Sequence, residues 1–301
     1  AGAVYSPPRN SLLLWTSERY CGAERHLGCY FLQVAGEENL KSTDRLKSTD
    51  KLKSTNGSSQ QTPFALDAER EQEVTGVDGI VHDFAPRDLA HLGAFWLQAQ
   101  SLHFIWRLNL RTRKYIDALR LEARERREAV GKSEEGMVIG MHVRRGDSFL
   151  AGRWMPTLQE YLIHARELKK RYGVTRIYIA SDDAATVEEC EALEEFDCYG
   201  LGIAREVYDV GAGAAPVHNP KEAQYGRWIE SRIAHGEVDG SEVALHAIAE
   251  IDTLAGCDFF VGRLDSAISR VALMLMFERK GPRPFISLDK PWAQPPWGLI
   301  N

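Results

Sequence analysis

A short apolar run, residues 137–143, constrains the fold of this chain more than any other stretch. It contains β-branched residues, follows a charged segment that ends in Gly136, and leads directly into Arg144 and Arg145. A short apolar run with these flanks is typical of a strand buried on both faces of a parallel sheet. The pattern therefore predicts a buried strand that ends in two arginines, with Gly146 as the turn.

Strand-like and helix-like segments alternate from this run almost to the C-terminus. Further strands are predicted at 176–183, 198–202, 258–262 and 284–288. Helices are predicted at 156–172, 184–195, 241–254 and 266–278, the third of them capped by Ser241. Residues 205–240, rich in Gly, Ala, Pro and charge, are predicted to run over the surface. The alternation predicts an α/β fold with a doubly wound parallel sheet and right-handed crossovers.

Residues 1–135 differ from this part and are predicted to form an N-terminal α/β and helical lobe. Residues 1–36 suggest a strand or two, and the helical spacing of apolar residues over 89–130 predicts two consecutive helices. Between them, residues 40–56 repeat a polar six-residue unit almost three times. Such a repeat cannot build a core, so about residues 40–62 are predicted to be a disordered insertion.

The composition excludes some classes of partner. The 301 residues are 44% hydrophobic and 27% charged, as in an ordinary soluble globular protein. A formal net charge of −6, with no basic stripe, argues against a nucleic-acid partner. No apolar stretch is long enough to span a bilayer and Ala1 does not begin a signal peptide, so no membrane contact is expected within this chain.

The cysteines suggest disulfides rather than a metal site. The chain has five: Cys21, Cys29, Cys190, Cys198 and Cys257. None lies in a Cys-x-x-Cys or zinc pattern, so no metal is expected. The first two, and likewise the next two, are close enough in sequence to form a disulfide in an oxidising compartment. Together with the glycosylation sequon at Asn56, they indicate a lumenal protein.

Polar side chains follow three of the predicted strands, at 142–147, 181–183 and 262–266. Ligands of open α/β sheets bind just beyond these carboxyl ends. Guanidinium groups suit a phosphorylated ligand, because each presents a rigid fork of donors. Since side chains alternate along a strand, His142 and Arg144 should share one face while Arg145 points to the other. The alternative is that one arginine forms a structural ion pair with Asp147.

The other polar residues at these ends each have a functional and a structural interpretation. Asp182 and Asp183 either contact ribose hydroxyls or cap the next helix. The helix that begins near Ser266 offers backbone N–H groups to a phosphate. Asp265 beside it competes with an anion for those donors, and its structural role is a plain N-cap. Arg270, one turn into that helix, either reaches the same phosphates or is a surface or ion-pair residue.

Several enzyme signatures are missing from the sequence. No Gly-rich phosphate loop is followed by lysine, which excludes a P-loop kinase. No Gly-x-Gly-x-x-Gly follows a strand, which argues against a nicotinamide enzyme, and there is no Gly-x-Ser-x-Gly elbow.

Three motifs resemble those of a known family. They are His142-Val-Arg-Arg-Gly-Asp147, Ile177-Tyr-Ile-Ala-Ser-Asp-Asp183, and Cys257-Asp-Phe-Phe-Val-Gly262 followed by Ser266 and Arg270. In order and spacing they resemble motifs of the α1,6-fucosyltransferases, which include the N-glycan core enzyme and the bacterial nodulation fucosyltransferases. The segment 285–289 resembles the one that follows in the core enzyme. The resemblance covers about residues 86–289.

The resemblance implies a two-lobed, GT-B-like fold in which residues 136–301 form a Rossmann-like nucleotide-sugar-binding domain. It implies an inverting, metal-independent transfer of fucose from GDP-fucose to a hydroxyl of a glycan or glycoprotein, with no cofactor. It also implies the Golgi lumen or another secretory compartment.

Particular residues gain roles from the resemblance. It implies that Arg144 holds the β-phosphate, that His142 and Glu250 contact the guanine, and that Ser266 contacts phosphate. Together with the residues at the strand ends, the predicted nucleotide-sugar site consists of His142, Arg144, Asp182, Asp183, Glu250, Asp265, Ser266 and Arg270. The catalytic set is Arg144, Arg145 and Asp147, in which two guanidinium groups would neutralise the leaving diphosphate.

The chain also departs from the family. Ser148 stands where the core enzyme has a lysine, and the presumed catalytic glutamate falls near Ala151. No carboxylate lies between 148 and 159, which leaves Asp147 as the candidate base. Two alternatives follow: a catalytically inactive GDP-sugar-binding pseudoenzyme, or a transferase that uses another nucleotide sugar.

Overall fold

The computed structural model describes residues 15–22, 29–32, 89, 92–146, 154–209 and 228–289. The chain divides into two compact units, residues 1–32 with 98–293 and residues 33–97 with 294–301. The sheet lies in the first unit. The predicted insertion at about 40–62 falls outside the described residues, and the predicted domain boundary after residue 135 stays a prediction.

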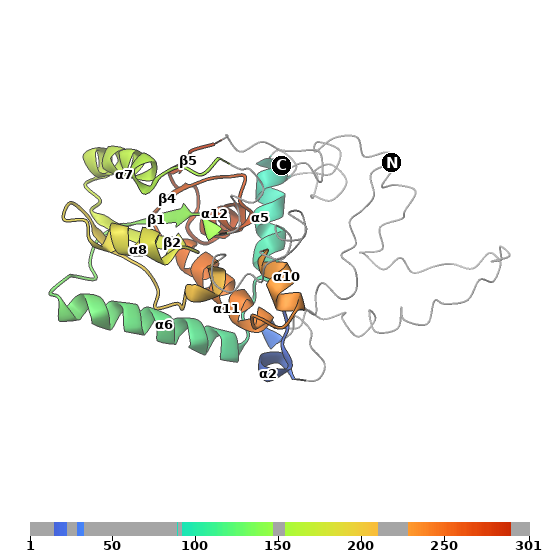
Figure 1. Cartoon of the computed structure of the whole chain (residues 1–301). Coiled ribbons are helices and arrows are strands. Elements are labelled where there is room, and N and C mark those ends of the chain that lie inside the picture. Colours follow the sequence, from blue (N-terminus) through green and yellow to red (C-terminus); the bar gives the residue numbers. More distant parts are fainter. Residues whose placement is uncertain are drawn as a thin grey trace, which may run out of the picture. The chain divides into compact units, whose positions relative to one another are not determined.

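In the described part of the chain, five parallel strands form one sheet in the order β3-β2-β1-β4-β5 (Figure 1). The strands are β1 (Val138–Val143), β2 (Arg176–Ser181), β3 (Asp197–Tyr199), β4 (Phe259–Gly262) and β5 (Phe285–Ser287). The predicted α/β fold with a doubly wound parallel sheet is confirmed. The strand order reverses between β1 and β4, which is where open α/β sheets bind their ligands.

The four helices predicted in the alternating part are all present. The stretch 205–240, predicted to run over the surface, also contains a 3₁₀ turn and a short helix whose Ile229 and Ile233 are buried, so that prediction is wrong in its described part. The described helices are α2 (Glu18–Cys21), α5 (Gly93–Ile105), α6 (Leu110–Ala129), α7 (Leu158–Tyr172), α8 (Ala184–Glu191), the 3₁₀ turn η6 (Glu206–Tyr208), α10 (Ile229–Ala234), α11 (Gly240–Leu254) and α12 (Ala267–Lys280). None of these described helices is long and apolar enough to cross a membrane. Helices α7 and α8 pack on the sheet together, and α11 packs on it beside α12.

One local prediction, the cap of α11, is wrong. The N-cap of α11 is Asp239, whose carboxylate accepts a hydrogen bond from the Ser241 N–H at 2.8 Å. The Ser241 hydroxyl instead accepts one from the backbone N–H of Ser17 at 2.6 Å, which takes it away from capping. Residues 1–36 were predicted to form a strand or two with loops. Their described part, 15–22 and 29–32, contains the short helix α2 and an antiparallel bridge between Phe31 and Leu108, and the rest of the prediction falls outside the described residues.

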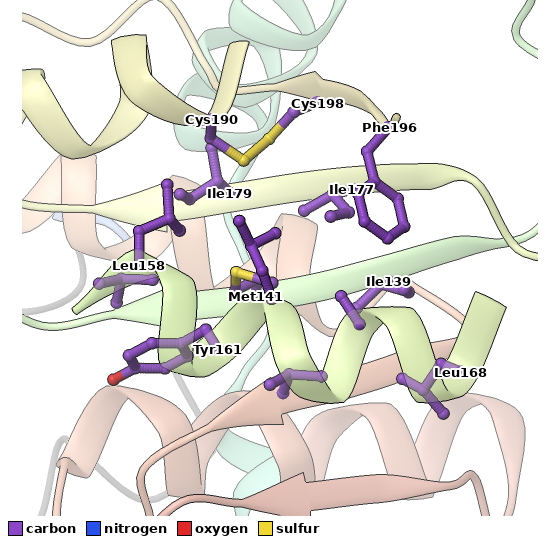
Figure 2. Packing of buried hydrophobic residues seen from close by; sticks show 14 of the residues in the cluster. Ile139, Met141, Leu158, Tyr161, Leu168, Ile177, Ile179, Cys190, Phe196 and Cys198 are labelled. Atoms are coloured by element: carbon purple, nitrogen blue, oxygen red, sulfur yellow. A yellow bond between two sulfur atoms is a disulfide. The ribbon is translucent and has the colours of Figure 1, made fainter. Parts of the chain in front are cut away.

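Side-chain alternation along β1 separates the two layers around the sheet. Ile139, Met141 and Val143 belong to the apolar cluster that includes α7 residues such as Leu158 (Figure 2). On the other face, a Cβ added at Gly140 would lie 3.1 Å from Cβ of Cys257, so the glycine lets the α11–β4 turn approach the strand closely.

The two cysteine pairs that are close in sequence both form disulfides. Cys190–Cys198 joins the end of α8 to β3 at the edge of the apolar cluster (Figure 2). Cys21–Cys29 links α2 to the segment that precedes the Phe31 bridge. Cys257 is free and buried, and burial raises the pKa of its thiol to about 12.

One buried carboxylate, Asp252 of α11, connects three helical segments. It accepts hydrogen bonds from Arg120 of α6 at 2.8 Å, from Arg279 of α12 at 2.5 Å and from the Trp106 indole at 3.1 Å. Burial alone would raise the pKa of Asp252, but the two arginines hold it below its usual value. The carboxylate is therefore charged when the protein is folded.

Replacing Asp252 should destabilise the fold strongly. We expect Asp252→Asn to lower the free energy of unfolding by about 3–5 kcal/mol, because it leaves two arginines without their buried partner. The exposed pair Arg124–Glu128 provides the control, and Arg124→Gln should leave the free energy of unfolding nearly unchanged. Urea denaturation of both variants measures this, and equal losses would contradict the assignment.

Candidate functional site

The ends of β1 and β2 are joined by the carboxylate of Asp182. Its Oδ2 pairs with Nη1 of Arg144, and its Oδ1 accepts a hydrogen bond from the backbone N–H of Arg145 at 2.7 Å. Gly146, at φ 41°, packs against the same carboxylate, and a Cβ there would collide with it. Asp182 therefore orients Arg144, a role that differs from both the ribose contact and the helix cap considered from the sequence.

Asp183 has the structural role. It is the N-cap of α8, and its carboxylate accepts a hydrogen bond from the Thr186 N–H at 3.0 Å. The Thr186 hydroxyl also donates to it. A ribose contact would have to share this carboxylate with the helix terminus.

His142 lies on the face of the sheet that α12 covers. The residue is buried, and its Nδ1 lies 2.7 Å from Oγ of Ser269 in α12. Burial, with smaller contributions from Arg144 and Arg263, lowers the pKa of His142 to about 3. The ring is therefore neutral at physiological pH, with one nitrogen available as donor and one as acceptor.

Arg145 points to the opposite face, as alternation predicted. Its Nη1 lies 3.5 Å from the carbonyl oxygen of Met155, in the segment that leads into α7. The two arginines of the motif thus contact different parts of the protein: Arg144 pairs with Asp182 and Arg145 approaches the Met155 carbonyl. The candidate base, Asp147, falls outside the described residues, as does its suggested ion pair with an arginine.

The loop after β4 is held by Asp289, whose carboxylate accepts hydrogen bonds from the N–H groups of Leu264 and Asp265, both at 2.9 Å. The N-cap of α12 is Ser266, so the interpretation of Asp265 as the cap is wrong. The Asp265 carboxylate pairs with Arg263 at 2.5 Å instead, because that guanidinium is the stronger partner.

Arg270 contacts the same loop from α12. Its Nη1 donates to the carbonyl oxygen of Leu264 at 2.8 Å. The structure therefore places both Ser266 and Arg270 at the β4–α12 junction. Neither is shown on a phosphate, and that role stays a prediction.

Glu250 of α11 is buried against an arginine that sequence reasoning missed. Nη2 of Arg205 lies 3.3 Å from Oε1 of Glu250, while Nε donates to the Ser181 carbonyl at 2.9 Å. Burial raises the pKa of Glu250 to about 8, against the lowering effect of Arg205 and with an added contribution from Asp182. Arg205 fell in the stretch predicted to be surface; the alternating apolar residues Leu201 and Ile203 before it were the signal of a buried segment.

The three strand ends meet as predicted, because β2, β1 and β4 are neighbours and parallel. His142, Arg144, Asp182 and the β4–α12 junction therefore line one edge of the sheet. Within the described ranges, no group of three or more His, Cys, Asp or Glu side chains is placed to hold a metal ion. The chemistry available at this edge is recognition of an anion by guanidinium and backbone N–H groups.

Comparisons with known proteins found similarity only among solved structures. No protein-family profile and no curated protein matches the chain. The NodZ α-1,6-fucosyltransferase soaked with GDP-fucose has a TM-score of 0.32 and 20% identity over 56% of this chain and 43% of that chain. POFUT1 in complex with GDP-fucose has a TM-score of 0.36 and 14% identity over 64% of this chain and 48% of that chain. The chain thus spans less than half the length of either protein.

The buried neutral state of His142 should make stability depend on pH. The unfolded chain binds a proton at this histidine near pH 6.5 and the folded chain only near pH 3, so stability is lost as pH falls through this window. Between pH 7.5 and pH 5, wild type should lose about 2 kcal/mol more free energy of unfolding than His142→Asn, which keeps a polar group near Nδ1.

Denaturation of both proteins at the two pH values measures this difference. The exposed histidine His235 provides the control, and His235→Asn should behave as wild type does. A His142→Asn variant whose stability follows the wild-type pH dependence would show that the ring titrates normally.

Proposed function

We propose that the chain is a GT-B-like glycosyltransferase that moves fucose from GDP-fucose to a hydroxyl of a glycan or glycoprotein, with inversion and without a metal ion. The observation that carries this proposal is the position of Arg144. It follows β1, beside β4, where the strand order reverses, and it belongs to a motif that resembles those of the α1,6-fucosyltransferases.

The donor diphosphate would bind between Arg144 and the N-terminus of α12. The Arg144 side chain keeps 28% of its surface exposed while Asp182 pairs with it. Fixing the plane of a guanidinium in advance reduces the entropy lost when a phosphate binds. The backbone N–H groups that follow Ser266 add the positive end of a helix dipole. Positive charge at this place stabilises the negative charge that develops on the leaving diphosphate.

The guanine base would lie toward α11 and α12, the side on which His142 and Glu250 are found. A carboxylate accepts hydrogen bonds from N1–H and the exocyclic amine of guanine, a pair that uracil lacks. Asp147 would be the base that activates the acceptor hydroxyl. The two disulfides and the sequon at Asn56 support a secretory compartment.

The pseudoenzyme remains a second candidate on one observation. The sequence offers no carboxylate between residues 148 and 159, and Ser148 replaces the lysine of the family. Incubation with GDP-fucose and a mixture of glycan acceptors, followed by mass spectrometry, separates the candidates. Fucosylated products support the transferase, and GDP binding without products supports the pseudoenzyme. Binding of UDP but not GDP would indicate another nucleotide sugar.

Arg144 should matter more than Arg145 for the phosphates. We expect Arg144→Lys to weaken GDP binding by about 1.5–3 kcal/mol, because lysine keeps the charge and loses the fork. GMP lacks the β-phosphate and should be little affected. Arg145→Lys, on the opposite face of the sheet, should change stability or turnover more than GDP affinity. Calorimetric titrations of both variants test this; equal weakening of GMP and GDP by Arg144→Lys would remove the assignment.

Glu250→Gln should narrow the preference for GDP over UDP. The exchange of a carboxyl oxygen for an NH₂ group leaves one of the two guanine donors without an acceptor, and this should reduce the ratio of the two affinities by about tenfold or more. Competition binding measures the ratio, with the exposed α8 variant Glu188→Gln as control. An unchanged ratio would place the base elsewhere.

Transfer should proceed in EDTA. No metal-ligand cluster is found in the described parts of the chain, and the strand-end arginines supply positive charge. Initial rates with and without chelator should agree. Activity that disappears with EDTA and returns with manganese would contradict the metal-independent mechanism.

A further inference from the structure

An exposed tryptophan, Trp154, lies at the carboxyl edge of the sheet and had no role in the sequence analysis. Its carbonyl oxygen accepts a hydrogen bond from Arg263, which directly follows β4. The next carbonyl, that of Met155, is 3.5 Å from Nη1 of Arg145, just beyond β1. The tryptophan is thus anchored between the two strands at which the strand order reverses.

The indole rests on a fixed support. The guanidinium carbon of Arg263 lies 5.5 Å from the ring centroid, within the range of a cation–π contact. Arg263 itself is buried and pairs with Asp265 at 2.5 Å and with Asp289 at 3.8 Å. Despite this anchoring, Trp154 keeps 52% of its surface exposed. The two exposed aromatic residues nearest the other end of the sheet, Tyr172 and Phe285, lie at its amino edge.

We propose that Trp154 is a stacking platform for the acceptor sugar. This inference rests on the proposed function, because only a glycosyltransferase needs an acceptor beside its donor. The ligand would be a pyranose with equatorial substituents, such as a β-linked N-acetylglucosamine or galactose unit. The axial C–H bonds of such a ring form an apolar face, which packs on the negative face of an aromatic ring.

The position of Trp154 favours the acceptor over the donor base as its ligand. His142 and Glu250, the residues proposed for guanine, lie on the side of the sheet covered by α11 and α12. Trp154 is held through Arg145 and Met155 on the α7 side. The transferred sugar would leave the diphosphate at Arg144 toward an acceptor on Trp154.

The test compares Trp154→Ala and Trp154→Phe with Ile163→Ala, which removes a similarly exposed apolar side chain from α7. Saturation-transfer NMR with N,N′-diacetylchitobiose and with lactose, in the presence of GDP, measures sugar binding. Calorimetry measures GDP binding, and steady-state rates with GDP-fucose give the acceptor KM. Trp154→Ala should weaken binding of the sugar and raise its KM at least tenfold, with GDP affinity unchanged within twofold. Trp154→Phe should lie between, and Ile163→Ala should match wild type.

Three results would overturn the inference. The first is sugar binding that survives Trp154→Ala, and the second is failure of the wild-type protein to bind either disaccharide. The third is a parallel loss of GDP affinity in Trp154→Ala, which would make the indole a platform for the guanine base. A wild-type protein that binds no GDP would instead overturn the proposed function, while the NMR measurement without nucleotide would still report on Trp154.

Discussion

The carboxylate of Asp182 fixes the two strand ends on which the site depends. It pairs with the guanidinium of Arg144 and accepts the backbone N–H of Arg145, and the turn at Gly146 leaves room for it. An arginine at the end of a strand loses much side-chain entropy when it is ordered. Because Asp182 orders Arg144 before any ligand arrives, the site is prepared for an anion.

Other charged side chains hold the neighbours of this pair. Arg205 binds the carbonyl of Ser181, the residue before Asp182, and also Glu250 of α11. Asp289 holds the N–H groups after β4. Removing one member of a buried ion pair leaves an uncompensated charge. Substitutions at these residues should therefore lower the stability of the fold strongly.

Local periodicity explains what the sequence could predict. The apolar runs at β1, β2 and β4, each followed by polar residues, were sufficient for the parallel sheet and for the meeting of their ends. The partners of those polar residues were not predictable, because pairs such as Arg205 with Glu250 join segments far apart in the chain. Rules for helix capping gave the wrong cap at Asp265 and at Ser241. Asp265 pairs with Arg263 instead, and the Ser241 hydroxyl accepts a hydrogen bond from the distant Ser17 N–H.

A crystal structure of the chain with GDP would show whether the donor diphosphate binds where β1 and β4 diverge. We expect β-phosphate oxygens within hydrogen-bond distance of the Arg144 guanidinium and of the first N–H groups of α12, with the Arg144–Asp182 pair retained. GDP bound elsewhere on the chain, or seated at this edge without contact to Arg144, would contradict this expectation.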